Sequence, residues 1–500
     1  MLKRIKVLVF FLLLSAIGAI WYFTRPEPLV APEISRYAAE WPLPHHDYGN
    51  TRSNPDSAIS ATTVFNLQPL WCFTLPAGAS AGGLTGNPII QGGRIYCRDG
   101  QSNVYALALD SGELLWKKEY QQAASGSGGL GVARNLVYVC VGDNGVAALD
   151  LKGREKWSVQ LTDKPGVAIN SQPIEYDGQV YVAASAPRSG NGSTPEGFGS
   201  IYTLDCKNGE IKWSYNIGEE AMPKSNLPWS SGEFGLFPAI DSAGGSIFWP
   251  TNLSGPWPSQ APIADKNVPA WLFQQRIAAF NHVSGQMLWL QSLRNQDYLN
   301  LDLKEPPVIT AIGNRSIILA AGQGGRVYAV EMNSGRPIWE VAVGEHQNDE
   351  LNSPPRTTIQ VQPGSGGGVA SPMACRDGVL YVPVVNQAGR INPGRSETAV
   401  LDPSQSSGEL LAIDIRYGKI LWRQTFDSAV RGGATIMGDL VFTATYAGRI
   451  YAFNRNSGEK MWEHQTDGNI SGWPAAAGKT IVFPVEKSEV GPVLAAFSLP

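Results

Sequence analysis

The chain has 500 residues, of which 43% are hydrophobic and only 16% are charged. Its formal net charge is −4 and it contains no long basic run, so it lacks the electrostatic footprint of a DNA- or RNA-binding protein. The 55 glycines and 15 tryptophans indicate many tight turns and extensive aromatic packing.

Residues 1–26 predict a membrane anchor. Basic residues at positions 3, 4 and 6 precede an uncharged apolar run from Val7 to Phe23. This run is at the short limit for spanning a bilayer and is longer than the core of a typical signal peptide. The basic residues predict that the N-terminus stays in the cytoplasm and that the rest of the chain is exported, to the periplasm of a bacterial envelope. A signal peptide cleaved after Ala19 is the alternative.

Residues 27–61 are rich in proline and polar residues and are predicted to form a tether between the anchor and the main domain. The pair His45 and His46 offers two metal-binding side chains, but adjacent side chains point in different directions. A surface loop is therefore the favoured interpretation of this pair.

Residues 62–500 are organised by a repeated phrase, seen most clearly as RIYAFNRNSGEKMW, Arg449 to Trp462. An alternating apolar strand leads into a glycine-containing turn and then into a strand that carries tryptophan, which is the pattern of a β-hairpin. Seven complete copies end at Trp116, Trp157, Trp213, Trp289, Trp339, Trp422 and Trp462. An eighth copy is split, because its first half lies at Ala495 to Phe497 and its tryptophan is Trp71. A split copy predicts a ring closed by strands from both termini.

A second series of apolar strands precedes the repeated phrase. These strands lie at 94–96, 136–139, 180–183, 247–249, 317–320, 380–384, 440–444 and 481–484. Two series of eight in register predict an all-β fold, an eight-bladed β-propeller. One blade cannot cover both faces of its own sheet, so neighbouring blades must stack. The tryptophan is large enough to fill the gap between blades, and a small residue ten positions earlier, such as Ala452, leaves room for it.

The five cysteines show no metal-ligand spacing. Cys97 and Cys140 occupy similar places in successive blades, so a disulfide between them is one interpretation for an exported protein. The favoured interpretation is that they are small buried apolar residues. Three long insertions, between Trp157 and Trp213, between Trp213 and Trp289 and between Trp339 and Trp422, are the expected place for binding loops.

The repeated phrase, with its glycine and tryptophan, resembles that of the pyrroloquinoline quinone (PQQ) propellers, and the resemblance extends from about Trp41 to Pro500. That family includes calcium-dependent alcohol dehydrogenases and also non-catalytic lipoprotein propellers of outer-membrane assembly. The fold does not distinguish these two functions.

The resemblance implies a set of metal ligands. The segment Phe237 to Trp257 is similar to the one whose asparagine ligates calcium, and Asn252 falls at that position. Glu196 resembles the glutamate ligand that precedes a blade strand. The segment Trp289 to Ile309 resembles the one that carries the catalytic aspartate. Oxygen ligands of this kind suit Ca²⁺, which takes six to eight of them.

The sequence also departs from the family pattern. At the position of the catalytic aspartate it has Asn300, whose amide cannot act as a general base. Asp302 is the predicted substitute, and it matches a position where some family members have an additional metal-binding aspartate. The tryptophan below the quinone is replaced around Gly235, with Phe234 and Phe237 nearby. The adjacent cysteine pair is absent, and the cationic contact to the quinone matches Gln323.

Two hypotheses follow, and the residues leave open whether the protein is an enzyme. The first is a membrane-anchored, exported propeller that acts as a binding or scaffold module in the cell envelope, holding an envelope protein or a small molecule at one face. The alternative is a divergent PQQ- and calcium-dependent alcohol dehydrogenase, with Glu196, Asn252 and Asp302 around the metal and Asp302 as catalytic base. Convergence of these three side chains in one funnel would favour the alternative.

Overall fold

The computed structural model describes residues 28–75, 84–164, 166–185, 199–217, 231–254, 274–295, 299, 301–351, 355–393, 399–400, 405–487 and 490–500. The predicted anchor, residues 1–26, lies outside these ranges and stays a prediction. In the described ranges, no helix is long and apolar enough to cross a membrane. The helical elements there are short: α2 (Pro32–Arg36) and the 3₁₀ turn η1 (Val64–Asn66).

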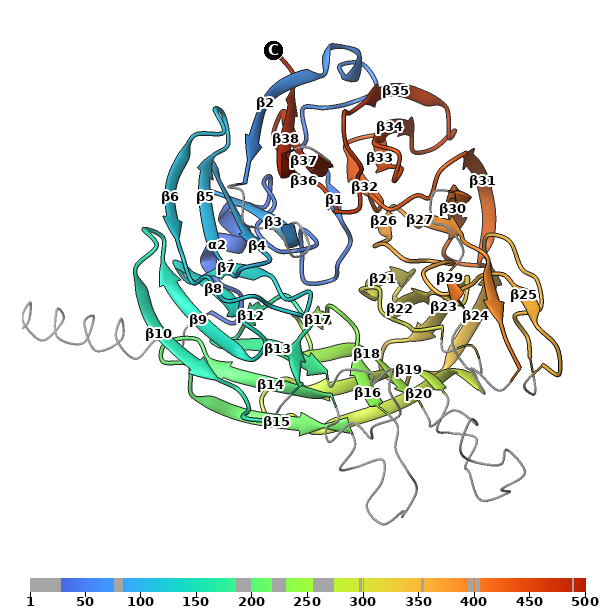
Figure 1. Ribbon diagram of the computed structural model, residues 1–500, viewed down its shortest axis with the longest axis horizontal. Coiled ribbons are helices and arrows are strands. Elements are labelled where there is room, and N and C mark those ends of the chain that lie inside the picture. The colour runs from blue at the N-terminus through green and yellow to red at the C-terminus, as the bar shows by residue number, and fades with distance from the viewer. Residues whose placement is uncertain are drawn as a thin grey trace, which may run out of the picture.

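The strands form eight antiparallel blades arranged around a central axis, as predicted (Figure 1). Blades 1 and 2 consist of β3 (Leu84–Gln91), β4 (Arg94–Asp99), β5 (Val104–Ala108) and β6 (Leu114–Lys118), then β7 (Leu130–Ala133), β8 (Leu136–Val141), β9 (Gly145–Asp150) and β10 (Glu155–Gln160). Blade 3 consists of β11 (Ala168–Ile169), β12 (Ile174–Tyr176), β13 (Gln179–Ser185), β14 (Ser200–Asp205) and β15 (Ile211–Asn216). Blade 4 consists of β16 (Ser231–Phe234), β17 (Ala239–Asp241), β18 (Ser246–Ser254), β19 (Gln274–Asn281) and β20 (Met287–Asn295).

The second half of the ring repeats this plan. Blades 5 and 6 consist of β21 (Val308–Ile312), β22 (Arg315–Gly322), β23 (Arg326–Glu331) and β24 (Pro337–Ala342), then β26 (Ala374–Arg376), β27 (Val379–Asn386), β30 (Ser407–Asp414) and β31 (Lys419–Phe426). Blade 7 consists of β32 (Thr435–Met437), β33 (Leu440–Ala444), β34 (Arg449–Asn454) and β35 (Lys460–Gln465). The third insertion contributes a small separate sheet of β25 (Ile359–Val361), β28 (Gly389–Ile391) and β29 (Ala399–Val400).

Blade 8 closes the ring with strands from both ends of the propeller, as predicted. It consists of β36 (Ala475–Ala477), β37 (Thr480–Lys487), β38 (Gly491–Ser498) and β2 (Gln68–Thr74). Trp71 of β2 lies opposite Ala496 of β38, in the register that places Trp462 opposite Ala452 in blade 7. Closure in this register pairs the free strand edge that would otherwise be open to association.

The repeated tryptophan joins neighbouring blades in the way the spacing predicts. A Cβ atom on Gly112, in the β5–β6 turn of blade 1, would lie 2.6 Å from Cδ2 of Trp71 in blade 8, so glycine is needed for this contact. The indole N–H of Trp71 also donates to the carbonyl oxygen of Leu109 over 2.8 Å. The same indole bond to the next blade is made by Trp116, Trp157, Trp213, Trp289, Trp339 and Trp422. Each contact therefore combines apolar packing with a directional hydrogen bond.

The cysteines are free. Cys97 and Cys140 are buried, 3% and 1% exposed, which confirms that they act as small apolar residues. The alternative of a disulfide between them is wrong, because the two residues belong to different core clusters: Cys97 packs with residues of blades 7 and 8, and Cys140 with residues of blade 3, where its thiol lies 3.6 Å from the oxygen of Ser171. Burial raises the pKa of the Cys140 thiol to about 12, so it stays protonated.

The surface-loop interpretation of His45 and His46 is wrong, because the N-terminal segment from residue 41 to residue 54 is packed inside the ring (Figure 1). The exposed fractions of Trp41, His45 and Arg52 are 0%, 1% and 0%. The segment pairs with blade 1 through Trp41, and β1 (Ser53–Asn54) adds a parallel strand to β32 of blade 7. Its polar groups bond to blades that are distant in sequence, and these bonds supply the partners that polar groups require once they are buried.

Candidate functional site

Two of the three predicted metal ligands lie side by side in the structure. Asn252, on β18 of blade 4, is 4% exposed, and Asp302, in the connection from blade 4 to blade 5, is 3% exposed. Asn252 Oδ1 accepts the N–H of Leu303 over 2.9 Å, and its Nδ2 donates to the oxygen of the same residue over 3.3 Å. Asn252 therefore pins the backbone next to Asp302. The third predicted ligand, Glu196, and the non-basic Asn300 lie outside the described residues.

A lysine that the sequence interpretation did not use lies between two carboxylates here. Lys304 Nζ is 2.9 Å from Asp302 Oδ2 and 3.4 Å from Glu233 Oε2. Glu233, on β16, is the strand partner of Asn252. The four residues Glu233, Asn252, Asp302 and Lys304 form a cluster that we call the acid–lysine cluster. The carboxylates of Asp302 and Glu233 are therefore already paired with the ammonium group of Lys304.

The acid–lysine cluster, as arranged, does not fit a calcium ion. Calcium takes six to eight oxygen ligands, whereas the point between Asp302 and Glu233 holds the Lys304 ammonium. A divalent cation placed there would be repelled by this charge. Among the described residues, no group of three or more His, Cys, Asp and Glu side chains is placed to hold a metal ion. Because Glu196 lies outside the described part, the three-ligand set stays a prediction.

Beside this cluster, the space around Gly235 is too small for an aromatic side chain that could stack below a quinone. A Cβ atom at Gly235 would lie 3.0 Å from Cβ of Pro250 and 3.1 Å from the oxygen of Lys304. The ring of Phe237 instead packs edge-on against His45, 4.3 Å between centroids, and lies 5.9 Å from Trp473. The predicted replacement of the family's tryptophan around Gly235 therefore has a physical basis, since the backbone of Lys304 and the ring of Pro250 fill the space that its side chain would need.

Gln323, which matches the cationic contact of the family, also borders the cluster. Its backbone N–H donates to the oxygen of Asp302 over 2.9 Å. The residue at the position where the resemblance implies a positive charge is therefore neutral, and Lys304 is a cation that this structure places beside Asp302.

Glu305 is a candidate residue that sequence reasoning missed. It is 5% exposed, and its Oε2 has no hydrogen-bond partner within the part of the chain that the structure describes. Burial raises the pKa of this carboxyl to about 8, against the opposing positive charges of Lys304, Arg431 and Arg52. A carboxyl that titrates close to neutral pH can exchange a proton under working conditions. The only signal in the sequence was an acidic residue in a short apolar and proline-rich segment.

Arg52 supplies a buried positive charge from the N-terminal segment. It donates to the oxygen of Ala434 over 2.8 Å, to Thr435 Oγ1 over 2.7 Å and to the oxygen of Pro474 over 3.0 Å. It also contacts His45 Nδ1 at 3.2 Å. Burial and the charge of Arg52 lower the pKa of His45 well below its usual value, so His45 is neutral at pH 7. The site thus contains ionisable groups from both the N-terminal segment and the blades.

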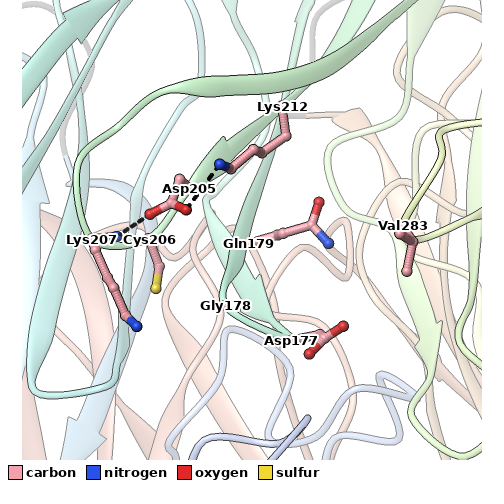
Figure 2. Close-up of a pocket in the computed structure, with 8 residues that line it drawn as sticks. All are labelled: Asp177, Gly178, Gln179, Asp205, Cys206, Lys207, Lys212 and Val283. Atoms are coloured by element: carbon pink, nitrogen blue, oxygen red, sulfur yellow. Dashed lines mark hydrogen bonds and ion pairs between the residues drawn. The ribbon is translucent and has the colours of Figure 1, made fainter. Parts of the chain in front are cut away.

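A separate pocket lies away from these residues, near the turns of blades 3 and 4 (Figure 2). Its volume is about 480 Å³, and it is lined by Asp177, Gly178, Gln179, Asp205, Cys206, Lys207, Lys212 and Val283. Asp205 forms an ion pair with Lys212 over 3.2 Å, as Figure 2 shows. These contacts are those of an ordinary hairpin turn, and none of the predicted site residues lines the pocket. The candidate site is therefore the acid–lysine cluster with Glu305 and Arg52.

Comparisons with known proteins identify relatives over most of the chain. A PQQ-repeat family model described as outer membrane protein assembly factor BamB matches residues 58–228, 221–369 and 406–496. Quinohemoprotein alcohol dehydrogenase of Comamonas testosteroni is 23% identical, over 87% of this chain and 70% of the relative. Quinoprotein alcohol dehydrogenase PedH of Pseudomonas putida is also 23% identical, over 85% of this chain and 81% of the relative.

Solved structures agree on the fold. The crystal structure of the Comamonas testosteroni quinohemoprotein alcohol dehydrogenase superposes with a TM-score of 0.78 at 19% identity, over 92% of this chain and 80% of the other. A europium-containing methanol dehydrogenase superposes with a TM-score of 0.76 at 18% identity, over 93% and 99% of the two chains. At these identities the likeness establishes the fold alone.

Proposed function

Because the chain belongs to the PQQ-repeat β-propeller family, we propose that it is a divergent dehydrogenase of the quinoprotein alcohol dehydrogenase type, with the acid–lysine cluster as its substrate site. The observation that carries this proposal is the placement of Asn252 beside Asp302, from two separate parts of the sequence. Relatives named as alcohol dehydrogenases that cover 85% and more of the chain support it.

The proposed roles rest on this chain's own residues. Asp302 accepts the proton of the alcohol hydroxyl, as predicted for the substitute base. Lys304 lies next to it and stabilises the negative charge that develops on the alcohol oxygen. Asn252 positions Asp302 by holding the backbone of Leu303. Calcium does not fit the cluster as arranged and the backbone at Gly235 offers no aromatic ring for a quinone to stack on, so no residue is assigned to a calcium-bound quinone. The hydride of the alcohol carbon would pass to the PQQ that the assay below supplies, and from it to the dye.

The test is alcohol-dependent reduction of an artificial electron-acceptor dye. The full-length protein, purified in detergent, is assayed with added PQQ, with and without Ca²⁺ or a lanthanide, against a series of primary alcohols. We expect alcohol-dependent reduction that Asp302→Asn lowers at least about a hundredfold. A folded protein that reduces no dye under any of these conditions would refute the proposal.

A binding or scaffold role in the envelope is the second candidate. It is favoured by the ion pair between Lys304 and the buried Asp302, which occupies the carboxylate that a metal-dependent enzyme would use as a ligand. No comparison singles out a partner for such a role. Failure of the dye assay, together with saturable binding of a small molecule or of an envelope protein that Asp302→Asn weakens, would support it.

We also propose that residues 1–26 anchor the propeller on the periplasmic side of the membrane. The support is the apolar run from Val7 to Phe23 with basic residues before it. Protease added to spheroplasts should degrade the propeller, and alkaline extraction should leave it in the membrane pellet. Recovery of intact protein from protease-treated spheroplasts would contradict this placement.

A further inference from the structure

We propose that Lys304 is a built-in cation that takes the place of a bound metal ion in the acid–lysine cluster, so that the site is complete without a metal. The inference concerns the source of positive charge and does not depend on alcohol oxidation. It assigns to Lys304 a role in holding the site together.

The first support is the convergence of two acidic side chains on one ammonium. Asp302 comes from the connection between blades 4 and 5 and Glu233 from strand β16, and both lie within 3.4 Å of Lys304 Nζ. The exposed fraction of the Asp302 side chain is 3%, that of Glu233 is 13%, and that of Lys304 is 34%. Buried carboxylates require a compensating positive charge, and the partly exposed lysine supplies it.

The second support is the way the lysine backbone is held. Leu303, which precedes it, is bonded through its N–H to Asn252, and the oxygen of Lys304 accepts the N–H of Leu236 over 3.2 Å. The oxygen of Asp302 is bonded in turn to Gln323. Hydrogen bonds on both sides of the lysine therefore fix the point from which its side chain emerges.

These constraints favour the ammonium over a metal from solution. The lysine is attached to the same short segment as Asp302, so its effective concentration at the carboxylates is far above that of a free cation. A divalent ion would have to displace the ammonium from both carboxylates or bind beside it against electrostatic repulsion. Either route lowers the affinity of the cluster for calcium and for lanthanides.

The experiment measures metal binding in the full-length protein in detergent, with neither quinone nor alcohol present. Terbium luminescence and calorimetric titration with Ca²⁺ are carried out on the wild type, Lys304→Gln, Lys304→Met and Lys304→Arg. We expect the two neutral variants to bind metal at least about tenfold more tightly than the wild type, because the competing charge is gone. Lys304→Arg keeps that charge and should behave like the wild type.

A second substitution locates the binding. Adding Asp302→Asn to Lys304→Gln should abolish the gained affinity, whereas a gain that survives it would place the metal elsewhere and overturn the inference. The inference would also be overturned if the wild type bound calcium tightly and Asp302→Asn abolished that binding. It would equally be overturned if Lys304→Gln and Lys304→Met both folded and had the same metal affinity as the wild type. Circular dichroism establishes folding, and Lys304→Met serves if Lys304→Gln does not fold. Since no activity is measured, failure of the dehydrogenase assay leaves this result unaffected.

Discussion

Glu305→Gln removes the titration of a carboxyl that is buried beside Lys304, Arg431 and Arg52. The pKa of Glu305 is raised by burial from 4.5 to about 8. Between these pH values the folded protein binds a proton that the unfolded chain has released, so this group's contribution to stability is complete below pH 4.5 and is lost as the pH rises towards 8. The raised pKa corresponds to roughly 5 kcal/mol, since each pH unit contributes about 1.36 kcal/mol.

Glutamine keeps the shape of the protonated acid but cannot ionise, so the variant should escape this loss. We expect the stability of Glu305→Gln relative to the wild type to increase with pH, by up to roughly 5 kcal/mol between pH 4 and pH 9. Urea denaturation followed by tryptophan fluorescence at half-unit pH steps measures the difference. Glu459→Gln, at an exposed position, is the matched control and should keep a constant difference from the wild type.

The result that would refute this reasoning is a stability difference between wild type and Glu305→Gln that does not change from pH 5 to pH 9. It would mean that Glu305 is ionised throughout this range, with Arg52 and Arg431 compensating its burial. Glu305 could then not exchange a proton near neutral pH.

Three further predictions test the ring and its interior. Gly112→Ala should lower the free energy of unfolding by about 2 kcal/mol or more, because the new methyl group meets Trp71 and the residue has a φ of +72°. Gly478→Ala, with a φ of +55° and nothing within 4 Å of the added Cβ, should cost only about 1 kcal/mol, and equal losses in thermal denaturation would contradict the contact. Arg52→Met should cost about 3–5 kcal/mol in urea denaturation, since it leaves three buried acceptors without their donor; a change below 1 kcal/mol would contradict that burial. With a thiol reagent, Cys72 alone of the five cysteines should react quickly in the native protein, whereas several fast thiols would mean that the blades open.

The propeller could be read from the sequence because its determinants are local and repeated. A tryptophan strand and a glycine turn recur in the seven complete copies, six of which have alanine ten positions before the tryptophan, and the split copy at Trp71 and Ala496 predicts the closing strand pair. Each repeat needs only its neighbours for burial, so the period of the sequence specifies the ring.

The N-terminal segment could not be read in the same way. It has no period, and its polar composition predicted an exposed tether with His45 and His46 at the surface. In the folded chain Arg52 bonds to Ala434 and Thr435, almost four hundred positions away. Whether such a segment is buried depends on contacts between residues this far apart in the sequence. No local sequence pattern indicates where its hydrogen-bond partners lie.

The candidate site was predictable in part. The resemblance placed Asn252 and Asp302 in one site, and the structure brings them together through Leu303. The part played by Lys304 and the raised pKa of Glu305 were not visible in the sequence, because both depend on which charges face each other after burial. Local pattern thus specified the scaffold and the neighbours of the site, whereas its electrostatics arise from desolvation and from pairs of charges that form only when the chain is folded.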